Sequence, residues 1–149
     1  MIIRIQAADF DIAAVNRELL AGRSDVGAIA SFIGRVRDLD GDPLKYMELE
    51  HYPGMTEMAL QGIAEKAQAR WQIVDLAIIH RIGALKPADQ IVMVSVLSAH
   101  RGDAFAACEF IMDYLKTEAP FWKKETSEQG SKWVEARKSD LFAQKKWDS

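Results

Sequence analysis

The chain has 149 residues, of which 49% are hydrophobic and 28% are charged, a size and composition typical of one globular domain. Its 19 Lys and Arg are outnumbered by 22 Asp and Glu, and the net charge of -3 argues against a general nucleic-acid binder, whose affinity rests on many phosphate contacts. Since no apolar run approaches the roughly 18 residues of a membrane span and the first residues do not resemble a signal peptide, we expect a soluble cytoplasmic protein.

The N-terminal segment predicts a short strand followed by a helix. Residues 2–5 are mostly apolar, and Asp11 is a typical N-cap residue. Gly22 is a typical stop after the last apolar residue of the helix. Between these two positions, the apolar side chains that form one helix face are Ile12, Val15, Leu19 and Leu20.

A second strand is predicted over residues 26–37. Alternate side chains in a strand point to the same face, so a strand ending here projects Arg35 and Arg37 together. The acidic and Gly/Pro-containing stretch 38–43 has the composition of a turn, and residues 44–52 predict the next extended segment.

The middle of the chain predicts a helix and then a hairpin. The helix begins at Pro53 and ends near Trp71, with apolar residues at three-to-four spacing. Residues 73–83 and 90–98 read as strands, and the short turn that contains Pro87 makes them antiparallel. The second of these strands is apolar on both faces, as expected for a central, covered strand.

The C-terminal third predicts a longer helix, over about residues 101–118. Because Ala119 precedes a proline, the helix is expected to end there and to hand the chain to an extended segment over 121–125. Residues 131–135 predict a last strand, and a polar tail follows from about residue 138. The apolar stripe of the helix is Ala104, Ala107, Cys108, Ile111, Met112 and Leu115.

The order of these elements predicts the fold class. Hairpins and helices are mixed instead of strictly alternating, so we expect an α+β protein with a mainly antiparallel sheet packed by helices. No linker, repeat or low-complexity tract divides the chain, which predicts a single domain over residues 1–149.

Residues 98–101 (Ser-Ala-His-Arg) are the first candidate site. They lie where a strand meets the start of a helix, and free N–H groups, an imidazole and a guanidinium at such a junction suit a phosphate. The alternative is that Arg101 is merely solvated and that His100 caps the helix or packs against it.

Lys116, Lys123 and Lys124 form a second candidate site around the predicted end of the long helix. A lysine crowded by other cations loses its proton more easily, which is what a base or nucleophile requires. Arg35, Arg37 and Arg101 are the cations that could provide this field. The alternative is an ordinary solvated basic face.

Arg35 and Arg37 are the third candidate, because they complete an anion clamp if their strand lies beside the helix start at His100. The alternative is an exposed strand end. His80 and His51 share strand faces with apolar residues, so both are expected to be packed, hydrogen-bonded histidines.

The cysteine and histidine content predicts no metal site and no disulfide. Cys108 is the one cysteine of the chain, and the three histidines have no zinc or iron–sulfur spacing. Cys108 lies on the apolar stripe of the long helix, where burial makes a thiol inert. A reducing compartment fits this content.

Seven blocks of the sequence, in order from about residue 26 to residue 137, resemble the family of molybdopterin synthase large, catalytic subunits. They are FIGRVR (32–37), LEHYPGMTE (49–57), HRIG (80–83), SAHR (98–101), FIMDYLKT (110–117), APFWKKE (119–125) and WVEAR (133–137). The resemblance implies an α/β-hammerhead fold and a homodimeric core, with a small ubiquitin-like subunit at each end of a heterotetramer.

The resemblance also implies the reaction. The small subunit brings sulfur as a C-terminal thiocarboxylate, and two sulfurs are transferred to cyclic pyranopterin monophosphate to form the dithiolene of molybdopterin. No metal or other cofactor is implied for this step. By the same resemblance Lys116 and Lys123 are the catalytic lysines, and the substrate contacts fall on Arg35, Arg37, His100, Arg101, Lys124 and Arg137.

Two other functions use the same features. A noncatalytic adaptor that grips a ubiquitin-like tail would need the basic groove but no pterin-sized pocket beside it. A self-contained sulfurtransferase would carry sulfur on Cys108, which would then have to be accessible and have a lowered pKa.

Overall fold

A computed structural model describes residues 1–38, 43–134 and 138–148 of the chain. The described residues form two four-stranded sheets and four helices. In chain order the elements are β1 (Ile2–Gln6), α1 (Ile12–Leu20), β2 (Ala28–Arg35), β3 (Leu44–His51), α2 (Met55–Arg70), β4 (Asp75–Arg81), β5 (Gly83–Leu85), β6 (Gln90–Ser98), α3 (Arg101–Glu118), β7 (Phe121–Ser127), β8 (Gly130–Val134) and α4 (Lys138–Lys145).

The first sheet has the strand order β1-β4-β6-β2 and is the centre of the molecule. Its two middle strands, β4 and β6, are apolar on both faces and nearly fully buried, because helices cover the sheet from both sides. β1 pairs with β4 in parallel, and the other two pairs are antiparallel. β2 is therefore an edge strand, and its first residue, Ala28, lies beside Ser98 at the end of β6.

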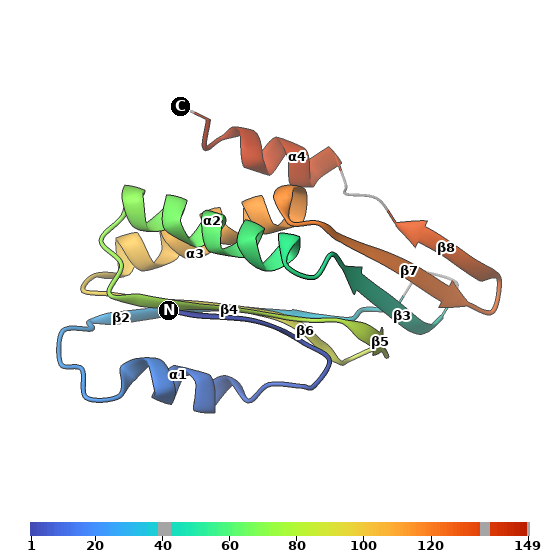
Figure 1. Cartoon of the computed structure of the whole chain (residues 1–149), viewed down its shortest axis with the longest axis horizontal. Helices are drawn as coiled ribbons and strands as arrows, with labels where there is room; N and C mark the ends of the chain where they lie inside the picture. The colour runs from blue at the N-terminus through green and yellow to red at the C-terminus, as the bar shows by residue number, and fades with distance from the viewer. Residues whose placement is uncertain (39–42, 135–137, 149) are drawn as a thin grey trace.

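Helices cover both faces of this sheet, with α1 on one side and α2 and α3 on the other (Figure 1). Asp11 caps α1 as predicted, since its Oδ1 accepts a hydrogen bond from the Ala14 N–H at 3.0 Å. The predicted apolar stripe of α3 is buried in full and packs with α2 against the sheet. Val15 and Leu19 of α1 close the opposite face with Ile79 and Leu97.

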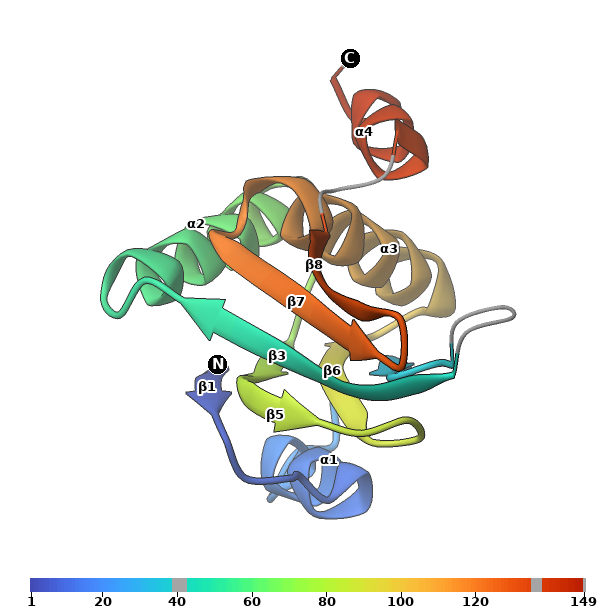
Figure 2. The same ribbon diagram turned by 90° about the vertical axis from the view of Figure 1, so that its right-hand side faces the viewer.

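The second sheet has the order β5-β3-β7-β8 and stands beside the first (Figure 2). Its pairs are all antiparallel. The chain passes from one sheet to the other between β4 and β5, where Gly83 takes a φ of +87° that an L side chain rarely adopts. The segment 73–83, predicted as one strand, is therefore divided between the two sheets by this glycine.

The C-terminal segment forms a helix, α4, where composition indicated only a polar tail. α4 lies over α3 (Figure 1) and is fastened by the residues that follow it. The Trp147 Nε1–H donates to Asp113 Oδ2 at 2.7 Å, its ring packs against Trp71 and Phe110, and its carbonyl accepts from Arg70 at 2.9 Å. Trp147 thus helps to anchor the last helix, together with the ion pairs of Lys146 with Glu109 and Asp113.

The α+β class and the mainly antiparallel pairing are confirmed. Each predicted helix is present, and the two long strands over 73–83 and 90–98 pair antiparallel as expected. The division into two sheets was not predicted, because it depends on which strands meet in space.

Candidate functional site

A cavity of about 640 Å³ opens where the C-terminal end of α3 meets the second sheet. Three of the predicted site residues line it: Arg37, Lys116 and Lys123. Its remaining lining residues are Met47, Leu49, His80, Ile91, Leu115, Thr117, Ala119, Phe121, Trp122, Val134 and Asp140. The cavity therefore combines an apolar wall with three cationic side chains from three separate segments.

The end of α3 brings the two lysines to this cavity. Lys116 lies in the last turn of the helix and is exposed. Ala119 takes an extended conformation ahead of Pro120, as predicted, and β7 begins at Phe121. The Thr56 hydroxyl of α2 donates to the Pro120 carbonyl at 3.1 Å and holds this corner in place. Lys123 on β7 thereby faces the same space as Lys116.

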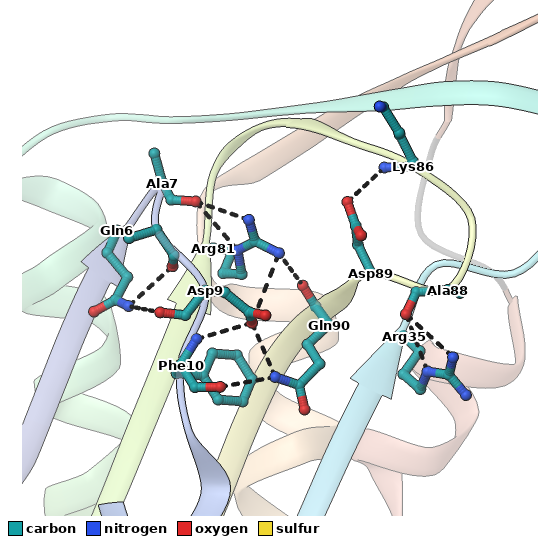
Figure 3. Close-up of polar contacts among 11 residues, drawn as sticks. Gln6, Ala7, Asp9, Phe10, Arg35, Arg81, Lys86, Ala88, Asp89 and Gln90 are labelled. Carbon is teal, nitrogen blue, oxygen red and sulfur yellow. Dashed lines mark hydrogen bonds and ion pairs between the residues drawn. The ribbon is translucent and has the colours of Figure 1, made fainter. Parts of the chain in front are cut away.

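Arg35 and Arg37 do not act together in the structure. Arg35 Nε and Nη2 both donate to the Ala88 carbonyl, at 3.2 and 3.1 Å, in the turn between β5 and β6 (Figure 3). Only Arg37 lines the cavity. A register shift between Gly34 and Arg35 ends the regular pairing with β6 at this point.

His100 and Arg101 lie at the opposite end of α3 from the two lysines. They line a small separate pocket with Gly27, Ala99 and Gly102. An 18-residue helix is about 27 Å long, so these side chains do not reach the cavity of their own chain. The condition for an anion clamp of Arg37 with the helix start is not met within this chain, because β2 runs antiparallel to β6 and its first residues, not Arg35, lie beside Ser98.

Two further predicted residues lie outside the cavity lining or outside the described residues. Lys124 alternates with Lys123 on β7, and its Nζ lies 5.8 Å from the centre of the Trp133 ring on the neighbouring strand. Arg137 lies outside the residues that the structure describes.

His80 is a cavity-lining residue that the sequence identified only as a packed histidine. Its side chain is nearly buried, its Nδ1 is 2.8 Å from the Arg81 carbonyl, and its ring stacks on Phe121 with centroids 3.8 Å apart. Burial, with a smaller contribution from the positive charge of Lys116, lowers the pKa of His80 to about 4, although the hydrogen bond with the Arg81 carbonyl raises it. The imidazole is therefore neutral at neutral pH.

Asp140 also lines the cavity, and the sequence does not point to it because its composition beyond residue 138 predicts only a polar tail. It adds a carboxylate to a wall that otherwise carries cations. Asp140 is far along the chain from Lys116 and Lys123, so no sequence motif links it to them.

Cys108 is buried, as predicted, and lies outside both pockets. Burial raises the pKa of its thiol to about 11. A thiol with such a pKa is a poor carrier of sulfur, because the thiolate is the reactive form.

Two features of residues 1–38, 43–134 and 138–148 bear on function. These residues contain no group of three His, Cys, Asp or Glu side chains placed to hold a metal ion. Among the same residues, no helix combines the length and apolar character needed to cross a membrane.

Comparison with known proteins gives matches that extend over most of the chain. The model of the MoaE protein family matches residues 5–118. A molybdopterin synthase catalytic subunit from Ralstonia nicotianae is 60% identical over 146 residues, which are 97% of this chain and 83% of that protein. Its counterpart from Vibrio cholerae is 51% identical over 147 residues, which are 98% and 97% of the two chains.

Solved structures of similar proteins also superpose on most of this chain. A molybdopterin biosynthesis MoaE protein from Burkholderia ambifaria superposes with a TM-score of 0.86 at 57% identity, covering 99% of this chain and 98% of that one. A molybdopterin synthase from Staphylococcus aureus superposes with a TM-score of 0.81 at 35% identity, covering 87% and 94%.

Proposed function

The chain belongs to the MoaE protein family, and from this premise we propose that it is the catalytic subunit of a molybdopterin synthase, with its reaction centre in the cavity at the end of α3. The observation that carries the site is that Arg37, Lys116 and Lys123 line one cavity although they come from three separate segments of the chain. The substrate is cyclic pyranopterin monophosphate, and the sulfur donor is the thiocarboxylated C-terminus of a small ubiquitin-like subunit.

The chemistry explains why cations gather here. A cyclic phosphate and a thiocarboxylate are both anions, and they repel each other more strongly as water is excluded from the site. We assign Arg37 to the substrate phosphate and Lys123 to the thiocarboxylate and the oxyanion of its tetrahedral intermediate. Lys116 then transfers a proton or attacks the acyl group.

His100 and Arg101 enter this proposal from a second copy of the chain. They lie too far from the cavity of their own chain, but a homodimer can place the start of one α3 against the cavity of the other. Exposed apolar side chains on this side support such pairing: Ile29 and Phe32 on the edge strand β2 are each 42% exposed, and Phe105 on α3 is 65% exposed. The pair adds an imidazole and a guanidinium suited to phosphate.

The remaining predicted residues have minor parts in the proposal. Lys124 contributes positive charge around the substrate, and Arg35 is held by the Ala88 carbonyl at the edge of this region. Arg137, a substrate contact that the family resemblance implies, lies outside the described residues. The whole chain, α4 included, forms a single domain. It acts in the cytoplasm, where two copies of it form the core of a heterotetramer with two small subunits.

Reconstitution tests the proposal. The purified chain is mixed with thiocarboxylated small subunit and the cyclic precursor, and dithiolene product is measured. We expect product with the wild type and a loss of about two orders of magnitude or more in turnover for Lys116→Ala and for Lys123→Ala, the scale for losing an acid–base group or an oxyanion donor. Activity within threefold of wild type in both folded variants would contradict the site.

The adaptor alternative is tested by calorimetry with the precursor alone. A catalytic subunit binds the precursor, and Arg37→Ala weakens that binding. A chain that binds the small subunit but not the precursor would be an adaptor.

A further inference from the structure

His80 has an unusual position for a histidine in a packed strand. It follows Leu76 and Ile78 on the face of β4 that packs against α3, and both of these residues are fully buried. His80 itself is only 6% exposed. An imidazole costs more to bury than the apolar residue that would fill the same space, so packing alone does not explain it.

The ring of His80 is fixed in plane and in tautomer. A carbonyl oxygen can only accept, so Nδ1 must carry the proton that it shares with the Arg81 carbonyl at 2.8 Å. The pKa of the ring, about 4, keeps it neutral, and two groups that face it, Lys116 from α3 and His51 from β3, also lower this pKa. The ring of His80 is therefore rigid, flat and uncharged.

The stacking contact of the His80 ring with Phe121 joins the two sheets. His80 belongs to β4 of the first sheet, and Phe121 is the first residue of β7 in the second. Their rings lie 3.8 Å apart and within 16° of parallel. On the other side of this corner, Thr56 of α2 holds the Pro120 carbonyl. The start of β7 is thus fixed between α2 and His80.

Lys123 depends on this corner. It lies two residues beyond Phe121, and side chains two apart on a strand share a face. Both line the cavity, with Lys116 reaching it from the end of α3. A shift of Phe121 would therefore move Lys123 relative to Lys116.

We propose that His80 is a positioning residue for sulfur transfer: by stacking on Phe121 it fixes the start of β7 and so sets where Lys123 stands across the cavity from Lys116. The inference rests on the proposed role of Lys123. His80 takes no proton and touches no reacting atom in this account. Misplacement of a reacting group by about 1 Å can cost two orders of magnitude in rate, so a positioning residue can matter as much as a contact residue.

The first test compares His80→Leu with His80→Phe in the reconstituted complex. The leucine has no flat ring, whereas the phenylalanine retains the stack and loses both nitrogens. We expect His80→Leu to lower kcat by roughly 10- to 100-fold with KM for the precursor changed less than threefold, since phosphate binding belongs to other residues. His80→Phe should recover kcat to within about threefold of wild type.

Thermal unfolding confirms that each variant is folded at the assay temperature. If His80→Leu does not fold, Phe121→Leu removes the same stack from the other ring and takes its place. A folded His80→Phe as impaired as His80→Leu would overturn the proposal, because the ring nitrogens would then be needed. Wild-type kcat in His80→Leu would overturn it as well.

A double-mutant cycle separates this inference from the proposed function. Under single-turnover conditions followed for hours, His80→Leu should cost almost nothing further in a Lys123→Ala background, because its effect acts through that lysine. The same factor in both backgrounds would overturn the positioning role while leaving the site intact. Wild-type activity of Lys123→Ala alone would instead show that the proposed site is wrong.

Discussion

Arg35 and Arg37 make different contacts, although alternation along the predicted strand places them on one face. Arg35 is used by the backbone, since its guanidinium is bound to the Ala88 carbonyl and fastens the β5–β6 turn to the end of β2 (Figure 3). Val36 adds two backbone bonds to the same turn, with Asp89 and Ala88, each 2.8 Å long. β2 ends at Arg35, so the strand predicted over residues 26–37 stops short of Arg37, and nothing local in the sequence indicates that a neighbouring turn binds Arg35.

We predict a clear difference between the two arginines in precursor binding. Arg37→Ala should weaken binding by at least about tenfold, the scale of a lost charge-assisted hydrogen bond, and Arg35→Ala by less than about threefold. Calorimetry with the precursor measures both. Equal losses would return Arg35 to the substrate site.

Substitution of Cys108 tests whether the transferred sulfur is carried on this chain or arrives on the small subunit. Cys108→Ala should retain turnover with the thiocarboxylated small subunit as the only sulfur source, because the thiol is buried and its pKa is about 11. Truncation leaves a small cavity that costs about 1 kcal/mol, so the assay belongs well below the unfolding temperature. Abolished turnover in a folded variant that binds both partners would support a cysteine sulfurtransferase.

At the level of elements, β4 couples the site to the stability of the fold through His80. The pKa of this histidine is lowered from 6.5 to about 4, so below pH 6.5 the unfolded chain binds a proton that the folded chain does not. The contribution of His80 to the free energy of unfolding is therefore complete above pH 6.5 and is lost as the pH falls toward 4. At 1.36 kcal/mol per pKa unit, the loss amounts to about 3 kcal/mol.

We predict that the free energy of unfolding of the wild type falls more steeply between pH 6.5 and pH 4 than that of His80→Phe. Urea unfolding of both proteins at several pH values measures the difference. Parallel curves would mean that His80 is protonated in the folded protein.

Trp147 is one of the residues that fasten α4 to the body of the protein, beside Gln144, which donates to Glu118, and Lys146, which pairs with Glu109 and Asp113. Trp147→Ala removes its ring from Trp71 and Phe110 and its hydrogen bond from Asp113, and should lower the free energy of unfolding by about 2 kcal/mol, less than for a fully buried ring. Phe142→Ala is the matched control, because Phe142 lies on α4 and is 79% exposed. Its effect should stay within about 0.5 kcal/mol. Equal effects would mean that α4 is not anchored at this point.

The helices and strands could be predicted from the sequence because capping residues and apolar spacing are local. Asp11 at the start of α1 and Pro120 after α3 act on their immediate neighbours, and the structure confirms both. The crossing at Gly83 could not be predicted, because it depends on which sheet each half of the strand joins. The role of Trp147 depends likewise on contacts with residues far away in the sequence.

In the whole molecule, the basic residues of the predicted site form two groups at opposite ends of α3, and the distance between them determines which residues can act together in one chain. Lys116 and Lys123 were predicted together correctly, because only a short turn separates them. His100 and Arg101 were predicted beside Arg37, but α3 holds them at its other end. The family resemblance supplied the residues, and the fold of one chain cannot bring all of them to one place.

Subunit complementation tests whether the reaction site is shared between two copies of the chain. Arg101→Ala and Lys123→Ala homodimers should each be nearly inactive in dithiolene formation with the small subunit and the precursor. After the two variants are unfolded and refolded together, half of the dimers are mixed, and one of the two sites in each mixed dimer has both wild-type residues. We expect recovery of about a quarter of wild-type activity. No recovery in verified mixed dimers would contradict a site completed by the second chain.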